Sequence, residues 1–304
     1  MSHKLLLAPG LLATAAFLAT GCGTKSTGGA VQSGVQVVAA ESSWGSIAAQ
    51  LGGSRARVES VITSPATDPH DYEPTAADAR SIAQAQLVIE NGIGYDPWAG
   101  KLVDANPASG RIVLNVGELV GIKPGGNPHR WYSPEDVQLV IDAIVRDYGK
   151  LEPQSSGYFA RRRARLETSG LAQYKRLLAT IKRRFHRVPV GASESIFVPL
   201  AQALGLRLLT PPSFLKAISE GTEPTAADKT TIDRQIAGRR IKVWIFNSQN
   251  STPDVRRITD AAHKRGIPVT TITETPVPES ISFQDWQSRQ LRAIAAALAQ
   301  ATGR

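Results

Sequence analysis

The stretch that decides the fold joins a strand-like apolar run to a helix start through a proline-stiffened loop. It reads Val58-Glu59-Ser60-Val61-Ile62-Thr63 and, three residues later, Thr67-Asp68-Pro69-His70-Asp71-Tyr72-Glu73-Pro74-Thr75. Each proline biases the residue before it away from helical geometry, and Thr75 can cap a following helix with Asp78 as its partner. The loop therefore holds His70 at the carboxyl edge of a strand, where ligands bind in open α/β sheets.

Strand-like and helix-like runs alternate along most of the chain on both sides of this loop. In the first half, strands are predicted at 36–40, 58–63, 87–91 and 111–116, and helices at 44–51, 75–84, 97–103 and 133–148. In the second half, strands are predicted at 188–192, 207–209, 242–246 and 269–272, and helices at 196–204, 225–236, 253–265 and 283–301. This alternation predicts parallel sheets with helices on both faces.

The segment between the two halves is predicted to be a long connecting helix. Residues 154–185 contain no proline and only two glycines, Gly157 and Gly170. Gly170 weakens a helix by ~1 kcal/mol relative to alanine, so a break there is a second possibility. The fold predicted is α/β, with two lobes that are each a parallel sheet flanked by helices, joined by one long helix. The boundaries are 35–153, 154–186 and 187–304.

An internal repeat supports two similar lobes. Residues 73–78, with the sequence Glu-Pro-Thr-Ala-Ala-Asp, recur letter for letter at 223–228. Coincidence of a good helix-start sequence is an equal explanation. In both cases the repeat predicts a capped helix start in each half.

The N-terminal 22 residues have the anatomy of a signal peptide. Lys4 provides the positive start, residues 5–19 are largely apolar, and Leu18-Ala19-Thr20-Gly21-Cys22 ends the segment. A Gly/Ser/Thr-rich tether, 23–34, follows. The end of the segment resembles a bacterial lipobox, which implies that Cys22 is lipidated and holds the protein on the extracytoplasmic face of the cell membrane.

Charge and cysteine content exclude several classes of protein. The net charge of the 304-residue chain is +9, and the basic residues concentrate between 160 and 190. Only two aromatic residues, Tyr174 and Phe185, lie among them, and no nucleic-acid motif is present, so we expect no nucleic-acid partner. A solvated helix face explains them best, with proximity to an anionic membrane as an alternative. Since Cys22 is the only cysteine, the body has neither a disulfide nor a thiolate metal ligand.

Four metal-capable residues stand in loops at strand ends or helix starts. His70 follows the second strand, and His129, in Asn127-Pro128-His129-Arg130-Trp131, precedes the helix that Ser133 can cap. Glu194 follows the strand at 188–192, and Glu274 follows the last strand. Each alone is more simply a surface residue or a helix-end charge. Only their shared position, two imidazoles from one lobe and two carboxylates from the other, indicates a joint metal site. His186 and His263 have no such setting.

These motifs together resemble the cluster A-I solute-binding lipoproteins of zinc and manganese ABC importers. The resemblance covers roughly residues 35–300 and includes Ser193-Glu194 and the helix start at Glu223-Pro224-Thr225. It implies that His70 and His129 are the first two metal ligands and Glu194 the third. Glu274 stands where the family usually has aspartate. The resemblance also implies that the protein is a monomer and that it is not an enzyme. It implies that the protein captures one divalent ion between its lobes and delivers this ion to a membrane permease.

The identity of the metal remains open between manganese and zinc. Glutamate at position 194 and the absence of a histidine-rich loop at 121–127 favour manganese, whereas the intrinsic affinity of nitrogen and oxygen ligands favours zinc. Two rival functions also remain. One is a metal-dependent hydrolase that uses the same His/Glu cluster, against which stands the lack of HExxH. The other is a binding protein for an organic solute.

Overall fold

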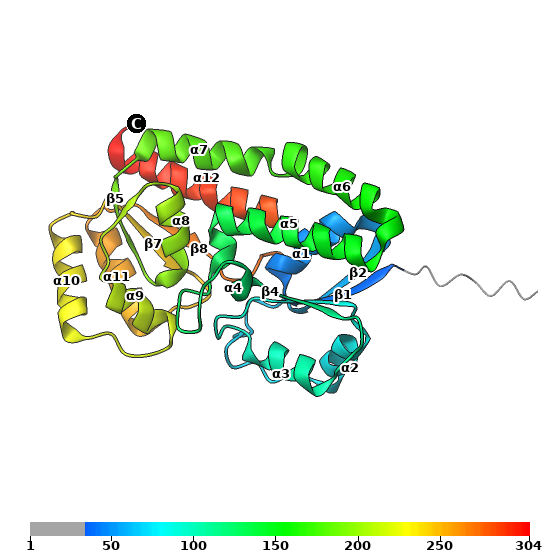
Figure 1. Ribbon diagram of the computed structural model, residues 1–304. Coiled ribbons are helices and arrows are strands. Elements are labelled where there is room, and N and C mark those ends of the chain that lie inside the picture. The colour runs from blue at the N-terminus through cyan, green and yellow to red at the C-terminus, as the bar shows by residue number, and fades with distance from the viewer. Residues whose placement is uncertain (1–33) are drawn as a thin grey trace, which may run out of the picture. The chain divides into compact units, whose positions relative to one another are not determined.

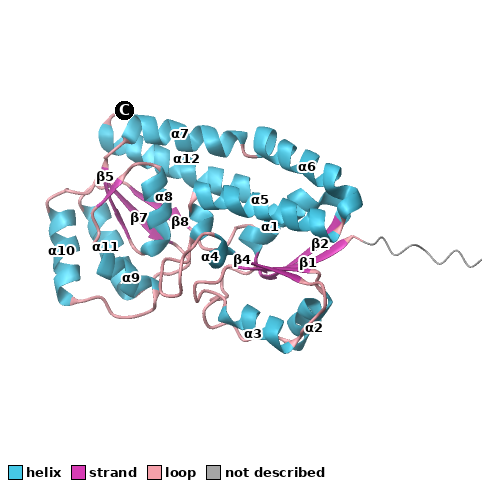
Figure 2. Ribbon diagram, viewed as in Figure 1, coloured by secondary structure: helices cyan, strands magenta, loops and turns pink. Residues whose placement is uncertain are grey.

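The structure, a computed structural model, describes residues 34–304. The predicted signal peptide, Cys22 and all but the last residue of the tether lie outside the described residues. Figures 1 and 2 show two parallel sheets with helices packed on both faces. The first sheet has the order β2 (Ala56–Ile62), β1 (Val35–Glu41), β3 (Leu87–Glu90), β4 (Ile112–Asn115), and the second has the order β6 (Arg207–Leu208), β5 (Pro189–Ala192), β7 (Val243–Asn247), β8 (Val269–Ile272).

The helices fall into three groups. Those that follow strands of the first sheet are α1 (Ser42–Gly52), α2 (Ala76–Gln84), α3 (Pro97–Ala105), α4 (Val116–Leu119) and α5 (Pro134–Leu151). The connecting segment consists of α6 (Ser156–Arg165), a π-helical turn (Leu166–Gly170) and α7 (Ala172–Phe185). The second sheet carries α8 (Val198–Ala203), α9 (Pro212–Ser219), α10 (Ala226–Ala237), α11 (Pro253–Lys264) and α12 (Phe283–Thr302).

The two sheets have the same strand order, and this order determines where a ligand-binding crevice can form. In each sheet the first strand lies between the second and the third, as in β2-β1-β3 and β6-β5-β7. The connections from these central strands leave in opposite directions, which opens a crevice at the carboxyl ends of the strands. The loops that carry the candidate ligands leave the sheets at these edges.

Helix caps form where the repeated sequence predicts them. The Thr75 hydroxyl accepts a hydrogen bond from the Asp78 backbone N–H at 3.2 Å, and the Asp78 carboxylate accepts one from the Thr75 N–H at 2.6 Å. Thr225 likewise accepts from the Asp228 backbone N–H at 3.2 Å. Since both pairs satisfy otherwise unpaired helix donors, the repeat marks the starts of α2 and α10, as predicted.

The long connection forms and contains an irregularity at the predicted place. Its π-helical turn ends at Gly170, next to the turn residue Leu171. A π turn widens the helix locally without ending it. The C-terminal helix α12 reinforces the connection, because it packs along α7 and reaches α1, where the Phe283 N–H donates to Ser46 Oγ at 2.9 Å. In Figure 1, α12 lies directly beneath α7.

The largest apolar core runs through both lobes. It includes Val37 of the first sheet, Val190 and Ile245 of the second, and Trp286 of α12. Apolar residues spaced three and four apart on α5, from Val137 to Tyr148, face this core. The lobes therefore share buried surface, which opposes wide hinge motion between them.

Two helices were not predicted, the four-residue α4 and the longer α9. No helix was expected between the strand at 207–209 and the helix at 225–236, yet α9 begins at Pro212. Two successive prolines resemble a loop, but proline is favourable in the first turn of a helix because its missing N–H has no intrahelical partner there. None of the helices within residues 34–304 combines the length and apolar character needed to cross a bilayer.

Candidate metal site

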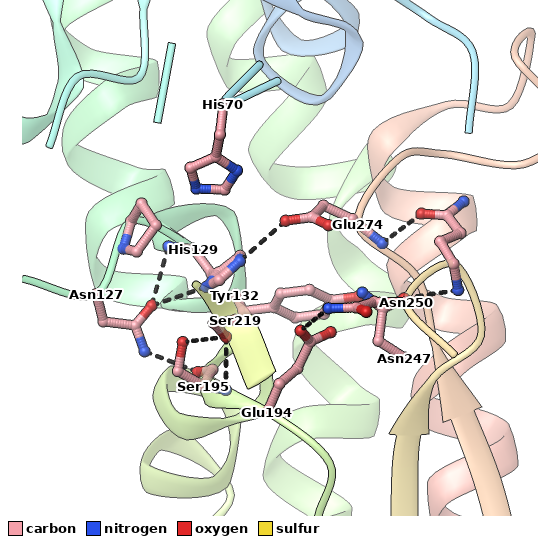
Figure 3. A network of polar contacts seen from close by, with 12 residues as sticks. His70, Asn127, His129, Tyr132, Glu194, Ser195, Ser219, Asn247, Asn250 and Glu274 are labelled. Atoms are coloured by element: carbon pink, nitrogen blue, oxygen red, sulfur yellow. Dashed lines mark hydrogen bonds and ion pairs between the residues drawn. The ribbon is translucent and has the colours of Figure 1, made fainter. Parts of the chain in front are cut away.

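The four predicted ligands line one pocket. A cavity of about 640 Å³ lies where loops of both lobes face each other, and its walls include His70 and His129 from one lobe and Glu194 and Glu274 from the other. Figure 3 shows the four side chains around a common space, with His70 at the top and Glu194 at the bottom. His186 and His263 are not among the lining residues.

Each histidine is oriented by the side chain two positions before it. Asp68 Oδ1 accepts a hydrogen bond from the His70 backbone N–H at 2.9 Å and lies 3.0 Å from His70 Nδ1. Asn127 Oδ1 accepts from the His129 backbone N–H at 3.1 Å and lies 2.9 Å from His129 Nδ1. The intervening prolines favour this turn, in which Asp or Asn bonds the backbone two residues on. With Nδ1 engaged, Nε2 is the ring nitrogen that each histidine offers to a ligand.

His129 and Glu274 are already in direct contact. His129 Nε2 lies 3.0 Å from Glu274 Oε1, and the His129 side chain is 2% exposed. Asn127 Nδ2 donates to the Ser195 carbonyl at 2.7 Å, so Asn127 Oδ1 faces the ring and can only accept. If His129 Nδ1 donates to Asn127 Oδ1, the 3.0 Å contact between Nε2 and Glu274 Oε1 is a hydrogen bond only when one of these two atoms carries a hydrogen. In this hydrogen bond a proton occupies the place between imidazole and carboxylate that a cation would take.

Glu194 is a buried acid with an unused acceptor. Its side chain accepts one hydrogen bond from Asn250 Nδ2 at 2.9 Å, whereas Oε1 is buried without a partner. Burial raises the pKa of Glu194 to about 8, and the charge of Glu274 acts in the same direction, while the hydrogen bond from Asn250 and the nearby polar side chains of Asn247 and Ser219 oppose the rise. A buried carboxylate oxygen without a hydrogen-bond partner, on a residue that lines the pocket, is a feature expected of a cation ligand.

The pKa of Glu274 is shifted in the opposite direction from that of Glu194. Burial disfavours its charged form, but the hydrogen bond from His129 and the charges of His129 and His70 outweigh burial and hold the pKa of the carboxyl below its usual value. Gln249 Oε1 fixes its backbone by accepting from the N–H groups of Glu274 and Thr275, at 2.8 and 2.9 Å. The site thus contains one carboxyl that readily stays protonated and one that readily ionises.

An aromatic wall separates the histidines from the interior. The buried Tyr95 ring lies 4.8 Å from the His70 ring and 5.9 Å from the His129 ring, centroid to centroid. Trp131 closes the other side of His129 at 5.4 Å. Burial and the charge of Glu274 raise the pKa of Tyr95 well above its ordinary value, so this ring stays neutral and does not compete as an anionic ligand.

The structure brings the four predicted residues to one pocket but only two of them into contact. Within residues 34–304, no three His, Cys, Asp or Glu side chains are gathered closely enough to form a ready metal site. With a side chain that is 37% exposed, His70 is the most exposed of the four candidate residues.

Sequence reasoning missed the supporting residues. Tyr95, Asn250 and Gln249 come from loops with no distinguishing pattern. Asn127 and Asp68 stood within the motifs but received no role. The shared spacing of Asp or Asn, then Pro, then His was the signal that could have identified them, because this order is typical of a side chain bonding the backbone two residues later.

The fold and the pocket define a class: a two-lobed α/β binding protein whose strand-end loops enclose a cation-binding space. The chain belongs to the ZnuA family, described as "zinc-uptake complex component A periplasmic", whose family model matches residues 37–297. This confirms the resemblance predicted from the motifs. The family consists of transporter solute-binding proteins, and the comparisons give no support to a hydrolase.

Individual relatives are distant. The chain is 26% identical to the manganese-binding lipoprotein MntA of Bacillus subtilis, over 87% of both proteins. It is 26% identical to MntA of Halalkalibacterium halodurans over 46% of this chain, a match that spans about half (48%) of that relative's length. Among solved structures, the periplasmic zinc-binding protein TroA of Treponema pallidum superposes with a TM-score of 0.70 at 20% identity, covering 87% of this chain and 99% of that one. This likeness supports the fold.

Proposed function

We propose that this protein captures one divalent transition metal ion, manganese or zinc, in the pocket between its lobes and delivers it to the permease of an ABC importer. One observation carries the proposal. Two imidazoles from one lobe and two carboxylates from the other line a single pocket, and one of the carboxylates has a buried, unpartnered oxygen. Such a set of nitrogen and oxygen ligands suits both metals.

Each proposed ligand has its own role in binding. His70 and His129 would ligate through Nε2, with Asp68 and Asn127 fixing the ring orientation through Nδ1. Glu194 and Glu274 would ligate through carboxylate oxygens and together neutralise the charge of the ion. In this arrangement the ion replaces the proton between His129 and Glu274 and draws Glu194 into its anionic form.

The different exposure of the proposed ligands suggests the order in which the ion meets them. The more exposed His70 would meet the ion first, and the buried His129 and Glu194 would complete the set. Because the lobes share an apolar core and are bridged by α7 and α12, we expect loop and side-chain adjustments in place of wide hinge closure. The fixed scaffold would limit the cost of assembling the site.

The choice between manganese and zinc rests on opposing considerations. The carboxylate at position 194 and the absence of histidine at 121–127 favour the harder ion, manganese. MntA is named as a manganese-binding lipoprotein and TroA as a zinc-binding protein. Direct competition between the two ions, with metal content measured after dialysis, decides which one this pocket retains.

We further propose that the protein works as a monomer anchored on the extracytoplasmic face of the membrane. Residues 1–22 would be a signal peptide, Cys22 the lipidated residue, and 23–34 the tether. The body would comprise an N-terminal lobe at 35–153, the linking helix at 154–186 and a C-terminal lobe at 187–304. The lipoprotein-like sequence at 18–22 supports the anchor, and mass spectrometry of the membrane-extracted protein tests it.

Isothermal titration of the purified protein with Mn²⁺ and Zn²⁺ tests the function. We expect one ion per chain for the wild type and a large loss of affinity for His70→Ala. His263→Ala, which changes a histidine outside the pocket, serves as the matched control and should bind like the wild type. Unchanged stoichiometry and affinity in the His70 variant would remove that residue from the site.

A further inference from the structure

The connecting segment carries the charge excess of the whole chain. Between Ser156 and Arg187 there are ten basic residues and one acidic residue, Glu167, so this segment has a net charge of +9, equal to that of the entire chain. Eight of the basic side chains are exposed, namely Arg161, Arg165, Lys175, Arg176, Lys182, Arg183, Arg184 and Arg187. We call these eight residues the basic face. Such a concentration of positive charge on one element creates a field that attracts anionic surfaces.

The basic face is not neutralised within the protein. Of the ten basic residues only Arg163 forms ion pairs among residues 34–304, with Asp142 and Glu167. The opposite side of the same helices is apolar, and Phe159, Tyr174 and Phe185 are buried there. Packing therefore fixes the helices with the basic side chains outward, and α6 and α7 form the upper edge of the body in Figure 1.

The first described residues lie beside the start of this segment. Val35, the first residue of β1, lies opposite Ala56 of β2, and the preceding Arg55 pairs with Glu152 at 3.2 Å, just before α6. Tyr158 Oη of α6 accepts from the Ser54 N–H at 3.0 Å. The 12 residues at 23–34 would have a root-mean-square span of roughly 20 Å as a flexible tether. A tether fixed in the membrane at Cys22 would therefore hold α6 near the bilayer surface.

A hollow next to the π-helical turn provides a place for a phosphate group. It measures about 440 Å³, and its lining includes Arg162, Arg165, Ser169 and Gln284. Guanidinium groups bind phosphate through paired hydrogen bonds, and hydroxyl and amide groups can add donors. Since no aromatic residue lines the hollow, stacking of nucleic-acid bases has no platform there.

From these observations we propose that the basic face binds the anionic phospholipid headgroups of the membrane that carries the protein. The inference rests on the proposed anchoring and adds an orientation to it. None of the residues that line the ion pocket comes from α6, the π turn or α7. The body can therefore lie on the bilayer through this face while the pocket stays open to arriving ions.

Sedimentation with lipid vesicles tests the proposal without the anchor. The full chain carrying Cys22→Ser, which cannot be acylated, is mixed at low salt with phosphatidylcholine vesicles that contain or lack 30% phosphatidylglycerol. We expect binding to the anionic vesicles only, weakening as salt is raised. Equal binding to both kinds of vesicle, or binding to neither, would overturn the proposal.

Matched triple variants distinguish the effect of the basic face on vesicle binding from the effect of the net charge of the protein. Arg161→Gln/Arg165→Gln/Arg176→Gln should weaken vesicle binding by about 100-fold, since each of the three basic residues near an anionic surface contributes roughly fivefold. The control Arg80→Gln/Lys101→Gln/Arg234→Gln removes three exposed basic residues of α2, α3 and α10 and should weaken it much less. Equal losses in the two sets would refute a specific face.

Metal titration in solution accompanies both triple variants. Neither set changes a residue that lines the pocket, so unchanged metal affinity shows that the variants are folded. Loss of vesicle binding with intact metal binding would show that the basic face itself, and not misfolding, accounts for the loss. Failure of metal binding in the wild type would refute the proposed function. It would not refute membrane binding by the basic face, which the vesicle measurements test separately.

Discussion

Metal binding should release about two protons per ion at pH 7. One proton lies between His129 Nε2 and Glu274 Oε1, which are 3.0 Å apart, and an ion that takes both atoms as ligands must displace it. The second comes from Glu194, whose pKa is raised to about 8 by burial and by the charge of Glu274. At pH 7 a group with this pKa is about 90% protonated, so the expected total is about 1.9 protons.

The same calculation predicts how the release changes with pH. At pH 8.5 a group of pKa about 8 is only about 25% protonated, so the total should fall to about 1.2. In the range where Glu194 remains protonated, apparent affinity should rise with pH, since hydroxide removes a proton with which the ion competes. Isothermal titration in buffers of different ionisation enthalpy measures the number of protons released.

Two variants assign the protons. Glu194→Gln has no proton to lose at this position and should release about one at both pH values. Glu279→Gln, an exposed residue outside the pocket, is the control and should behave like the wild type. Release of less than half a proton at pH 7, or no change between pH 7 and 8.5, would refute the interpretation of Glu194 and of the His129–Glu274 contact.

Further predictions concern the support of the site and the core. Asn127→Ala should weaken metal binding by roughly 10–100-fold because His129 loses the acceptor that orients it, whereas Asn127→Asp keeps an acceptor and should bind more tightly than the alanine variant in the same titration. Burial, together with the nearby Asp96 and Glu90, raises the pKa of Glu41 well above its usual value, so wild-type stability should fall as pH rises above about 4.5 through the folded-state pKa. Chemical denaturation should therefore show Glu41→Gln more stable than the wild type by about 1–3 kcal/mol at pH 8 and nearly equal at pH 5; equal stability at pH 8 would contradict this. Ile144→Ala, in the buried stripe of α5, should destabilise the protein by about 2–5 kcal/mol in denaturant melts while leaving metal stoichiometry at one.

The sequence predicted the fold because the local signals agreed with the final packing. Caps at Thr75 and Thr225, and apolar runs of strand length such as 87–91, pointed to elements that the structure forms. The exceptions were the short α4 and α9. In α9, consecutive prolines at 211 and 212 serve equally well in a loop or in the first turn of a helix. Local sequence could not decide between these outcomes because the packing of Phe214 and Leu215 into the interior decides them.

The meeting of the four candidate residues in one pocket was predictable from the sequence, but their contacts were not. Position at strand ends was enough to bring His70, His129, Glu194 and Glu274 to one pocket. Their pairing was not predictable, because the His129–Glu274 contact joins residues 145 positions apart. The unpartnered oxygen of Glu194 depends on the same long-range packing, which also brings Asn250 to its other oxygen.

Anomalous diffraction from crystals of the metal-loaded protein tests the central claim most directly. We predict one peak per chain, within bonding distance of His70 Nε2, His129 Nε2 and carboxylate oxygens of Glu194 and Glu274, at ~2.0–2.2 Å if the ion is zinc. An ion held by residues of one lobe alone, or bound outside this pocket, would contradict the account.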